Sequence, residues 1–188
     1  MEGKREAEQV SVFVSKYKEK AALNQYWYSP KTIEVIVKEV ELVAKKVAFL
    51  STPSIYFSLS DAAIKKESYV FDLDTQFACG SNFVQYDFNK PTDIPTSLWH
   101  SFDCVVIDPP FITADVWKKY GATVTALLRP QGKIILTSTH ENAELLHSLF
   151  AVTPQLFSPS VPHLVYQYRL YCNYPSTFFS EPNPEIGD

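Results

Sequence analysis

The fold is decided by the segment Phe102-Asp103-Cys104-Val105-Val106-Ile107-Asp108-Pro109-Pro110-Phe111. Its apolar first part predicts a strand buried on both faces of a sheet. Ligands of open α/β sheets bind beyond the carboxyl ends of the strands, so the tetrapeptide Asp108 to Phe111 is expected at a binding edge. Two prolines lack N–H donors and fix φ, which leaves carbonyl oxygens in a rigid array. With the Asp108 carboxylate they can hold the N–H groups of an attacking amine, beside an apolar wall formed by Phe111.

The pattern around this segment is one of alternating strands and helices. Short apolar runs closed by polar or turn residues predict strands at residues 47–50, 69–71, 83–86, 102–107 and 133–136. Helices are predicted at residues 115–128 and 141–150, and a closing hairpin at residues 152–157 and 163–173. The sequence therefore predicts an α/β fold with a mostly parallel seven-stranded sheet, helices on both faces and an antiparallel C-terminal strand.

The chain has 188 residues, enough for one domain with an appended arm. Its first segment has helical spacing, carried by Val10, Phe13, Val14, Tyr17 and Ala21. Ser29 followed by Pro30 predicts the N-cap and first turn of the next helix. We expect an N-terminal helix and aromatic arm at residues 1–28, a domain at residues 29–175, and a disordered tail rich in Ser, Pro, Glu and Asp at residues 176–188.

Composition and charge narrow the class of protein. The chain is 46% hydrophobic and 20% charged, as ordinary soluble domains are, and carries a net charge of −4. Its lysines are scattered, so we expect no stable nucleic-acid binding and favour a small-molecule or protein partner. Three widely spaced cysteines predict neither zinc nor disulfides, and no metal site is expected. Without an apolar signal region or a membrane-length stretch, a cytoplasmic protein with no membrane partner is expected. The sequence does not fix the oligomeric state, for which a monomer is favoured.

Acidic residues directly follow three of the predicted strands. Asp72, Asp87 and Asp108 would meet at one edge of a parallel sheet. A nucleoside offers donors to such carboxylates, and we assign Asp72 to the ribose hydroxyls and Asp87 to the adenine amino group, with Asp74 as an alternative to Asp72. Any single one of these residues is as well explained as a helix cap, whereas three in register favour a ligand.

The loop after the first strand distinguishes between cofactors. Ser51-Thr52-Pro53-Ser54 contains no glycine, whereas dinucleotide folds have glycines there to bring the backbone close to a pyrophosphate. This argues against NAD and FAD. S-adenosylmethionine has no phosphate, and the hydroxyls of this loop can serve its methionine end.

These residues resemble the class I methyltransferases with an Asn/Asp-Pro-Pro-aromatic motif. More closely, the chain is similar to the elongation factor 1-alpha lysine methyltransferases, a family once labelled N6-adenine DNA methyltransferases. The similarity runs from Val10 to Tyr174. It is carried by Gln25-Tyr26-Trp27-Tyr28-Ser29, Leu50-Ser51-Thr52-Pro53-Ser54, Phe71-Asp72-Leu73-Asp74 with Phe77, Phe83 to Asp87, Phe102 to Phe111, Gly132-Lys133-Ile134-Ile135-Leu136, and Tyr168 to Tyr174.

The resemblance implies a Rossmann-like fold, with S-adenosylmethionine as cofactor and a lysine amine of elongation factor 1-alpha as substrate. It makes residues 29–175 a methyltransferase domain. Asp108 and the Pro109 carbonyl would orient the amine within the catalytic set Asp108, Pro109, Pro110 and Phe111. Cofactor binding would fall to Ser51, Thr52, Pro53, Ser54, Asp72, Asp74, Asp87 and Asp108. Trp27, Tyr28 and Phe111 would wall the substrate site and stabilise a cation.

Other interpretations remain open at this stage. The same motif holds an adenine amino group in adenine-N6 methyltransferases of DNA or RNA, although such an enzyme needs base flipping and a basic groove. A non-catalytic binding module with the same fold is a further alternative. The intact motif and the acids at the strand ends argue against it. Trp27 and Tyr28 are equally explained by hydrophobic docking of the arm on the domain.

Overall fold

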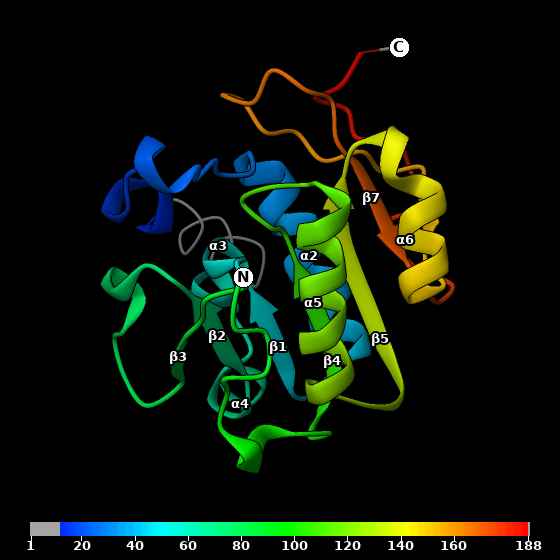
Figure 1. The fold of residues 1–188 in the computed structure, drawn as a ribbon. Coiled ribbons are helices and arrows are strands. Elements are labelled where there is room, and N and C mark those ends of the chain that lie inside the picture. The colour runs from blue at the N-terminus through cyan, green and yellow to red at the C-terminus, as the bar shows by residue number, and fades with distance from the viewer. Residues whose placement is uncertain (1–11, 188) are drawn as a thin grey trace.

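The computed structural model describes residues 12–187 and is built around one seven-stranded sheet (Figure 1). Its strands are β1 (Val47–Leu50), β2 (Tyr69–Asp72), β3 (Phe83–Gln85), β4 (Phe102–Ile107), β5 (Leu128–Ser138), β6 (Thr153–Pro154) and β7 (Arg169–Cys172), in the order β3-β2-β1-β4-β5-β7-β6. The first five pair in parallel, and β7 runs antiparallel to both β5 and β6. The predicted sheet architecture is confirmed.

Helices cover both faces of this sheet. They are α2 (Pro30–Val43), α3 (Pro53–Ser58), α4 (Ala62–Glu67), α5 (Ala114–Leu127) and α6 (Ala143–Phe150), with short 3₁₀ turns η1 (Ala21–Leu23), η2 (Thr75–Phe77), η3 (Thr96–Leu98) and η4 (His140–Asn142). In Figure 1, α5 lies in front of the sheet and α2 behind it. As predicted, α2 begins with Pro30 after Ser29, whose hydroxyl accepts the Thr32 amide hydrogen at 3.1 Å. Among residues 12–187, no helix combines the length and apolarity that a membrane crossing requires.

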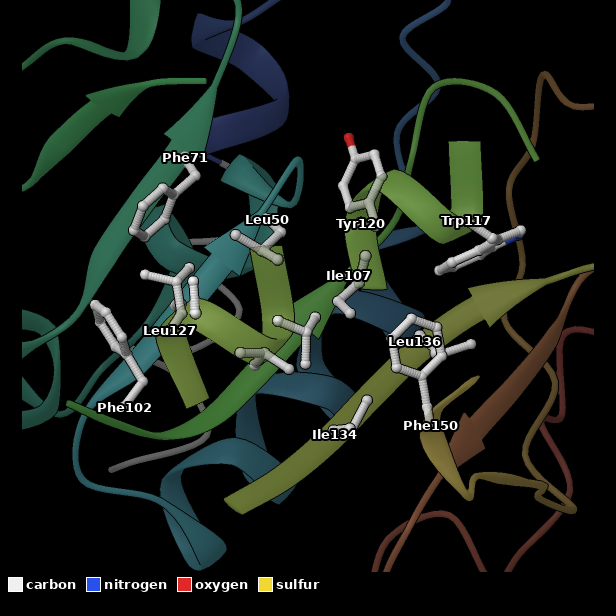
Figure 2. Packing of buried hydrophobic residues seen from close by; sticks show 14 of the residues in the cluster. Leu50, Phe71, Phe102, Ile107, Trp117, Tyr120, Leu127, Ile134, Leu136 and Phe150 are labelled. Atoms are coloured by element: carbon white, nitrogen blue, oxygen red, sulfur yellow. The ribbon is translucent and has the colours of Figure 1, made fainter. Parts of the chain in front are cut away.

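The central strand β4 divides its side chains between two apolar cores. Val105 and Ile107 point to the face covered by α5 and α6, while Cys104 and Val106 pack toward α2 and α3. All six residues of β4 are buried, as expected of a strand covered on both sides, although Asp103 interrupts its apolar run. Figure 2 shows Trp117 and Tyr120 of α5 above the first of these faces. Packing on both faces fixes the position of the carboxyl ends of the strands, and the residues of the site lie at these ends.

Several predicted boundaries shift. The described part of the first helix covers only residues 12–16, so the predicted helical continuation to Ala21 is wrong; Val10 lies outside the described residues. Phe13 and Tyr17 are buried against Phe77, whereas Val14 is 40% exposed. The predicted turn before residue 133 is part of the long β5, in which Gln131 has a φ of 62°. Beyond residue 16, where the helix ends, aromatic packing on Phe77 helps to hold the arm against the domain.

The tail is the main correction to the predicted organisation. Residues 176–187 were expected to be disordered from their composition, yet they pack against α2. The buried carboxylate of Glu39 accepts the amide hydrogens of Thr177 and Phe178 at 3.1 and 2.7 Å. Phe179 is fully buried, and Ser29 donates its hydroxyl to Glu185. One buried aromatic ring and one buried acid therefore hold a segment whose average composition favours disorder.

Candidate active site

A cavity of about 290 Å³ opens at the carboxyl ends of β1, β2 and β4. This is at the lower end of the range typical of small-molecule sites. Its lining includes most of the predicted site residues, from five separate segments: Trp27, Ser51, Pro53, Asp72, Asp87, Asp108, Pro109, Pro110 and Phe111. The predicted convergence of Asp72, Asp87 and Asp108 on one edge is therefore present, because the parallel strands that precede them end together.

Asp108 lies directly after β4 and is held by a hydroxyl from the neighbouring strand. Thr137 of β5 donates to Asp108 Oδ1 at 3.0 Å, and the Tyr28 hydroxyl lies 2.6 Å from Thr137 Oγ1. Burial raises the pKa of Asp108 to about 7, and the hydroxyls of Thr137 and Tyr28 oppose that rise. The carboxyl group is thus poised to exchange between its charged and neutral forms near neutral pH.

Asp72, the last residue of β2, is a buried acid that faces the cavity. Its side chain is 9% exposed, and Oδ1 accepts the backbone amide hydrogen of Asp74 at 2.9 Å. Burial raises its pKa to about 7, and the nearby Asp74 charge adds to the rise. A carboxylate in this position is stabilised by a ligand that brings hydroxyl donors, as a ribose does.

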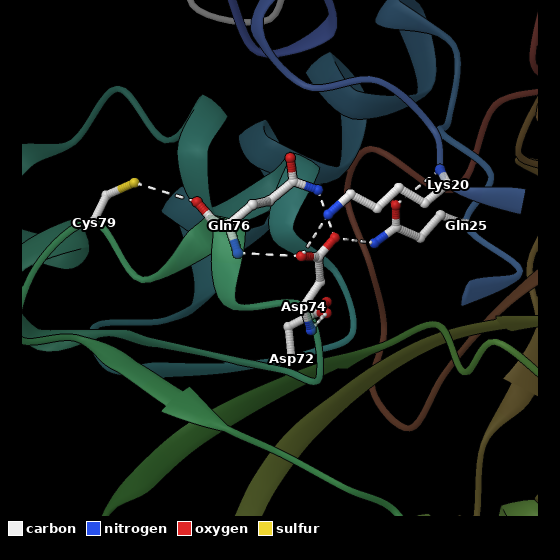
Figure 3. A network of polar contacts seen from close by, with 6 residues as sticks. All are labelled: Lys20, Gln25, Asp72, Asp74, Gln76 and Cys79. Carbon is white, nitrogen blue, oxygen red and sulfur yellow. Dashed lines mark hydrogen bonds and ion pairs between the residues drawn. The ribbon is translucent and has the colours of Figure 1, made fainter. Parts of the chain in front are cut away.

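Asp74 faces the arm rather than the cavity (Figure 3). Its carboxylate accepts Lys20 Nζ at 2.9 Å, Gln25 Nε2 at 2.9 Å and Gln76 Nε2 at 2.5 Å. Burial raises the pKa of Asp74, but these donors outweigh it and lower the pKa overall. The alternative assignment of the ribose to Asp74 is therefore not supported, since its acceptors are already used.

Asp87 combines a place at the cavity with a local hydrogen bond. It lines the cavity after β3, and its Oδ1 also accepts the amide hydrogen of Asn89 at 2.9 Å. That bond closes a local turn, and no helix directly follows Asp87, so the helix-cap explanation does not apply to this acid. The second carboxylate oxygen is available in the lining for a ligand donor.

Only part of the loop after β1 reaches the cavity. Ser51 and Pro53 line it, whereas Thr52 is buried and donates its hydroxyl to the Val106 carbonyl at 3.2 Å. Ser54 is 2% exposed and lies outside the lining. The sequence predicted that the Thr52 and Ser54 side chains contact the cofactor. The structure corrects this, because both side chains turn inward at the start of α3 and lie outside the cavity lining.

Ser51 adopts the backbone conformation that glycine usually supplies in such loops. Its φ is 58°, a left-handed value that strains an ordinary residue. Two contacts stabilise it: the Ser51 amide hydrogen is donated to Phe71 O at 2.9 Å, and its hydroxyl lies 2.7 Å from the Tyr120 hydroxyl. The loop therefore keeps the tight turn of a nucleotide fold without glycine.

The arm closes over the cavity, but its two predicted aromatic residues differ in place. Trp27 lines the cavity and donates Nε1–H to the Tyr17 carbonyl at 3.0 Å. Tyr28 is 4% exposed and lies outside the lining, so its predicted contact with substrate is wrong. Asn24 of the same arm donates its side-chain amide to the Pro110 carbonyl. Trp27 therefore both docks the arm on the domain and lines the cavity.

Sequence patterns missed several residues of the site. Thr137, Asn24, Tyr120 and Tyr168 were not predicted, although the last three line the cavity. The polar end of β5 carried a usable signal for Thr137, since it follows an apolar run as Asp72 and Asp108 do. Tyr120 and Tyr168 look like ordinary core aromatics in sequence, and only packing brings them to this edge.

Known proteins place this arrangement in context. The family model described as "Probable N6-adenine methyltransferase" matches residues 19–176. Human EEF1A lysine methyltransferase 1 is 35% identical over 161 residues, covering 82% of this chain and 74% of that protein. The zebrafish (Danio rerio) protein of the same name is 32% identical over 168 residues, covering 84% of this chain and 100% of its own.

A solved structure shares the fold. The branched-chain polyamine synthase from Thermus thermophilus, in complex with N4-aminopropylspermidine and 5'-methylthioadenosine, superposes with a TM-score of 0.65 at 15% identity. The match covers 89% of this chain and 62% of the synthase. At this identity the likeness extends to the architecture of the sheet and its helices.

Proposed function

The chain belongs to the family of the EEF1A lysine methyltransferases, and from this we propose that it methylates a lysine side chain of translation elongation factor 1-alpha with S-adenosylmethionine as donor. The observation that carries the proposal is the placement of Asp108-Pro109-Pro110-Phe111 at the mouth of a cavity that also contains Asp72. In this proposal the motif at residues 108–111 holds the substrate amine, and Asp72 holds the nucleoside of the donor. The substrate would place the enzyme in the cytoplasm.

The residues present fit the proposed cofactor. Asp72 is a buried acid whose pKa is raised to about 7, so it gains from ligand hydroxyl donors that supply the hydrogen bonds it lacks. Asp87 lies at the same edge for an exocyclic amine, and Ser51 and Pro53 are placed at the end near Asp108. When bound, S-adenosylmethionine supplies an electrophilic methyl group.

In the proposed reaction, the motif at residues 108–111 holds the neutral lysine amine in line with the methyl group of the donor. A lysine amine has an ordinary pKa near 10.4 and attacks only when it has lost its proton, which burial in an apolar cavity favours. The Asp108 carboxylate and the Pro109 carbonyl accept its N–H groups and leave the nitrogen lone pair free. The Pro110 carbonyl is used by Asn24, which leaves Pro109 as the backbone acceptor in this proposal. Such positioning supplies much of the barrier reduction in a group transfer.

Aromatic rings form the outer wall of the amine site. Phe111 is 52% exposed at the cavity, and its ring meets Phe88 edge to face with centroids 6.5 Å apart. Trp27 lines the cavity from the arm. Rings in this position stabilise the positive charge that the nitrogen gains on methylation, by cation–π attraction.

An adenine amino group is the second candidate acceptor, because the matching family model carries that description. A net charge of −4 and scattered lysines disfavour it, since DNA and RNA binding depends on basic surfaces. The lysine assignment is therefore preferred.

The test offers the same enzyme both kinds of acceptor. Purified elongation factor 1-alpha, duplex DNA and single-stranded RNA are each incubated with methyl-labelled S-adenosylmethionine, and products are read by mass spectrometry. We expect label on a lysine of the elongation factor. Methyladenine in nucleic acid, or no transfer to the factor, would refute the assignment. The Asp108→Ala variant is the control for enzyme-dependent transfer.

A further inference from the structure

Three segments far apart in the sequence meet behind the amine site. Asp108 follows β4, Thr137 lies on the adjacent β5, and Tyr28 closes the arm just before α2. Because Ile107 pairs with Leu136 in the sheet, the next residues of both strands, Asp108 and Thr137, are neighbours at its edge. The register of β4 and β5 therefore places the Thr137 hydroxyl next to the Asp108 carboxyl group.

The hydrogen bonds in this group run in one direction. Thr137 has a single O–H, which it donates to Asp108 Oδ1 at 3.0 Å. When Asp108 is ionised it can only accept, so Thr137 donates to it, and Tyr28 is then the donor in the 2.6 Å contact between the Tyr28 and Thr137 oxygens. Both residues are buried, at 4% and 1% exposure, which keeps water from competing for these bonds.

On this basis we propose that Tyr28 and Thr137 are positioning residues: their hydroxyl relay holds the Asp108 carboxyl in the orientation and charge state that receives the substrate amine. The inference rests on the function proposed above. Thr137 occupies Oδ1, so the amine is assigned to Oδ2. Neither hydroxyl contacts the substrate, since neither Tyr28 nor Thr137 lines the cavity.

Electrostatics of the pocket supports the relay. Burial raises the pKa of Asp108 to about 7, and the hydroxyls of Thr137 and Tyr28 act against that rise. The other titratable groups that interact electrostatically with Asp108 are the phenols of Tyr120 on α5 and Tyr168 before β7. Burial raises the pKa of both, so both are neutral at pH 7. The two hydroxyls are therefore the main groups that favour the carboxylate.

Packing and hydrogen bonding can be separated at both positions. The Tyr28 ring belongs to the core between α2 and the sheet, so Tyr28→Phe keeps the packing and removes only the donor. Thr137→Val keeps the shape without the hydroxyl, while Thr137→Ser restores the donor. Tyr171→Phe is the matched control, because its buried hydroxyl donates to the Thr139 carbonyl at 2.9 Å in the same region of the sheet.

The first measurement is the pH dependence of kcat/KM for methyl transfer, with cofactor affinity measured alongside. In Tyr28→Phe and Thr137→Val, the apparent pKa that Asp108 contributes to the pH profile of kcat/KM should rise by about one unit. Below that pKa, kcat/KM should therefore fall about tenfold. The loss should shrink at higher pH, and cofactor affinity should stay within about twofold because that site is left intact. Thr137→Ser and Tyr171→Phe should behave as the wild type. The substrate amine titrates identically in all variants, so differences report the enzyme group.

The second measurement needs no turnover. The carboxyl carbon of Asp108 is titrated by NMR in carbon-13 aspartate-labelled protein, with Asp108→Asn to assign the signal. An upward pKa shift in Tyr28→Phe and Thr137→Val, absent in Tyr171→Phe, supports the relay. Unchanged titration in both variants, or an equal shift in the control, overturns it. If the wild type transfers no methyl to elongation factor 1-alpha, the proposed function fails while this titration still decides the relay.

Discussion

Asn24 of the N-terminal arm donates its side-chain amide to the backbone carbonyl of Pro110, although 86 positions separate the two residues. Asn24 itself has a left-handed φ of 52°, at the end of η1, which turns its side chain toward the motif. An amide nitrogen thus already uses one oxygen of the rigid proline array. The contact ties the arm to the residues proposed to hold the substrate amine.

Replacing Asn24 should loosen the arm. In Asn24→Ala the Pro110 carbonyl loses its donor, and the arm keeps the bonds of Lys20 and Gln25 to Asp74 together with its aromatic packing on Phe77. We expect faster tryptic cleavage after Lys18 and Lys20, read by mass spectrometry of short digests. The matched control is Asn82→Ala, whose amide serves carbonyls of Lys66 and Ser68. Equal cleavage in wild type and Asn24→Ala would show that the contact does not hold the arm.

Asp108 should be required for methyl transfer and dispensable for the donor. We expect Asp108→Ala to reduce kcat by at least about a hundredfold, because the amine loses its charged acceptor. S-adenosylmethionine affinity, measured by calorimetry, should change little. Near-normal turnover in this variant would contradict the mechanism, and loss of donor binding would move Asp108 to the cofactor site.

Asp72 should show the opposite pattern. Asp72→Asn replaces a charged acceptor with a neutral one, and hydrogen bonds to charged groups contribute about 1.5–3 kcal/mol. We expect donor affinity to fall roughly 10- to 100-fold by calorimetry. Asp61→Asn is the control, because Asp61 caps α4 and lies outside the cavity lining. Unchanged affinity in Asp72→Asn would remove the ribose assignment.

The same substitution predicts a pH-dependent gain in stability. Burial raises the pKa of folded Asp72 to about 7, from an ordinary value of 3.8. The folded state therefore binds this proton more tightly than the unfolded chain does, so the group favours folding below about pH 4 and loses that contribution as pH rises through 7. Asp72→Asn should raise Tm more at pH 8 than at pH 5 in the absence of donor. An equal shift at both pH values would contradict the raised pKa.

The C-terminal segment offers a matched pair of phenylalanines. Phe179 is fully buried, whereas the adjacent Phe178 is 39% exposed. Phe179→Ala should destabilise the protein by about 3–5 kcal/mol in urea unfolding, as core Phe→Ala changes do. Phe178→Ala should cost less than half as much, because its side chain buries less surface. Equal, small effects would mean that the segment does not contribute to the core.

Much of the fold could be predicted because its signals are local. Residues 47–50 and 102–107 are strands with the predicted bounds, because short, mostly apolar runs ended by polar residues are typical of strands in a sheet covered on both faces. The predictions failed where a segment's fate depends on distant contacts. The tail is ordered by Glu39 and Phe179, and the first helix stops short where Tyr17 packs on Phe77.

The sequence by itself determined the chemistry of the motif and the edge on which it lies. Strand alternation sets that edge, and the residues Asp108, Pro109 and Pro110 carry their acceptors wherever the chain places them. Tertiary structure alone decided which acids remain available and which groups support them. Asp74 and Asp72 are two positions apart, yet Lys20 and Gln25 reach only the first. Thr137 reaches Asp108 because parallel strands bring their ends together, a relation that no spacing along the chain records.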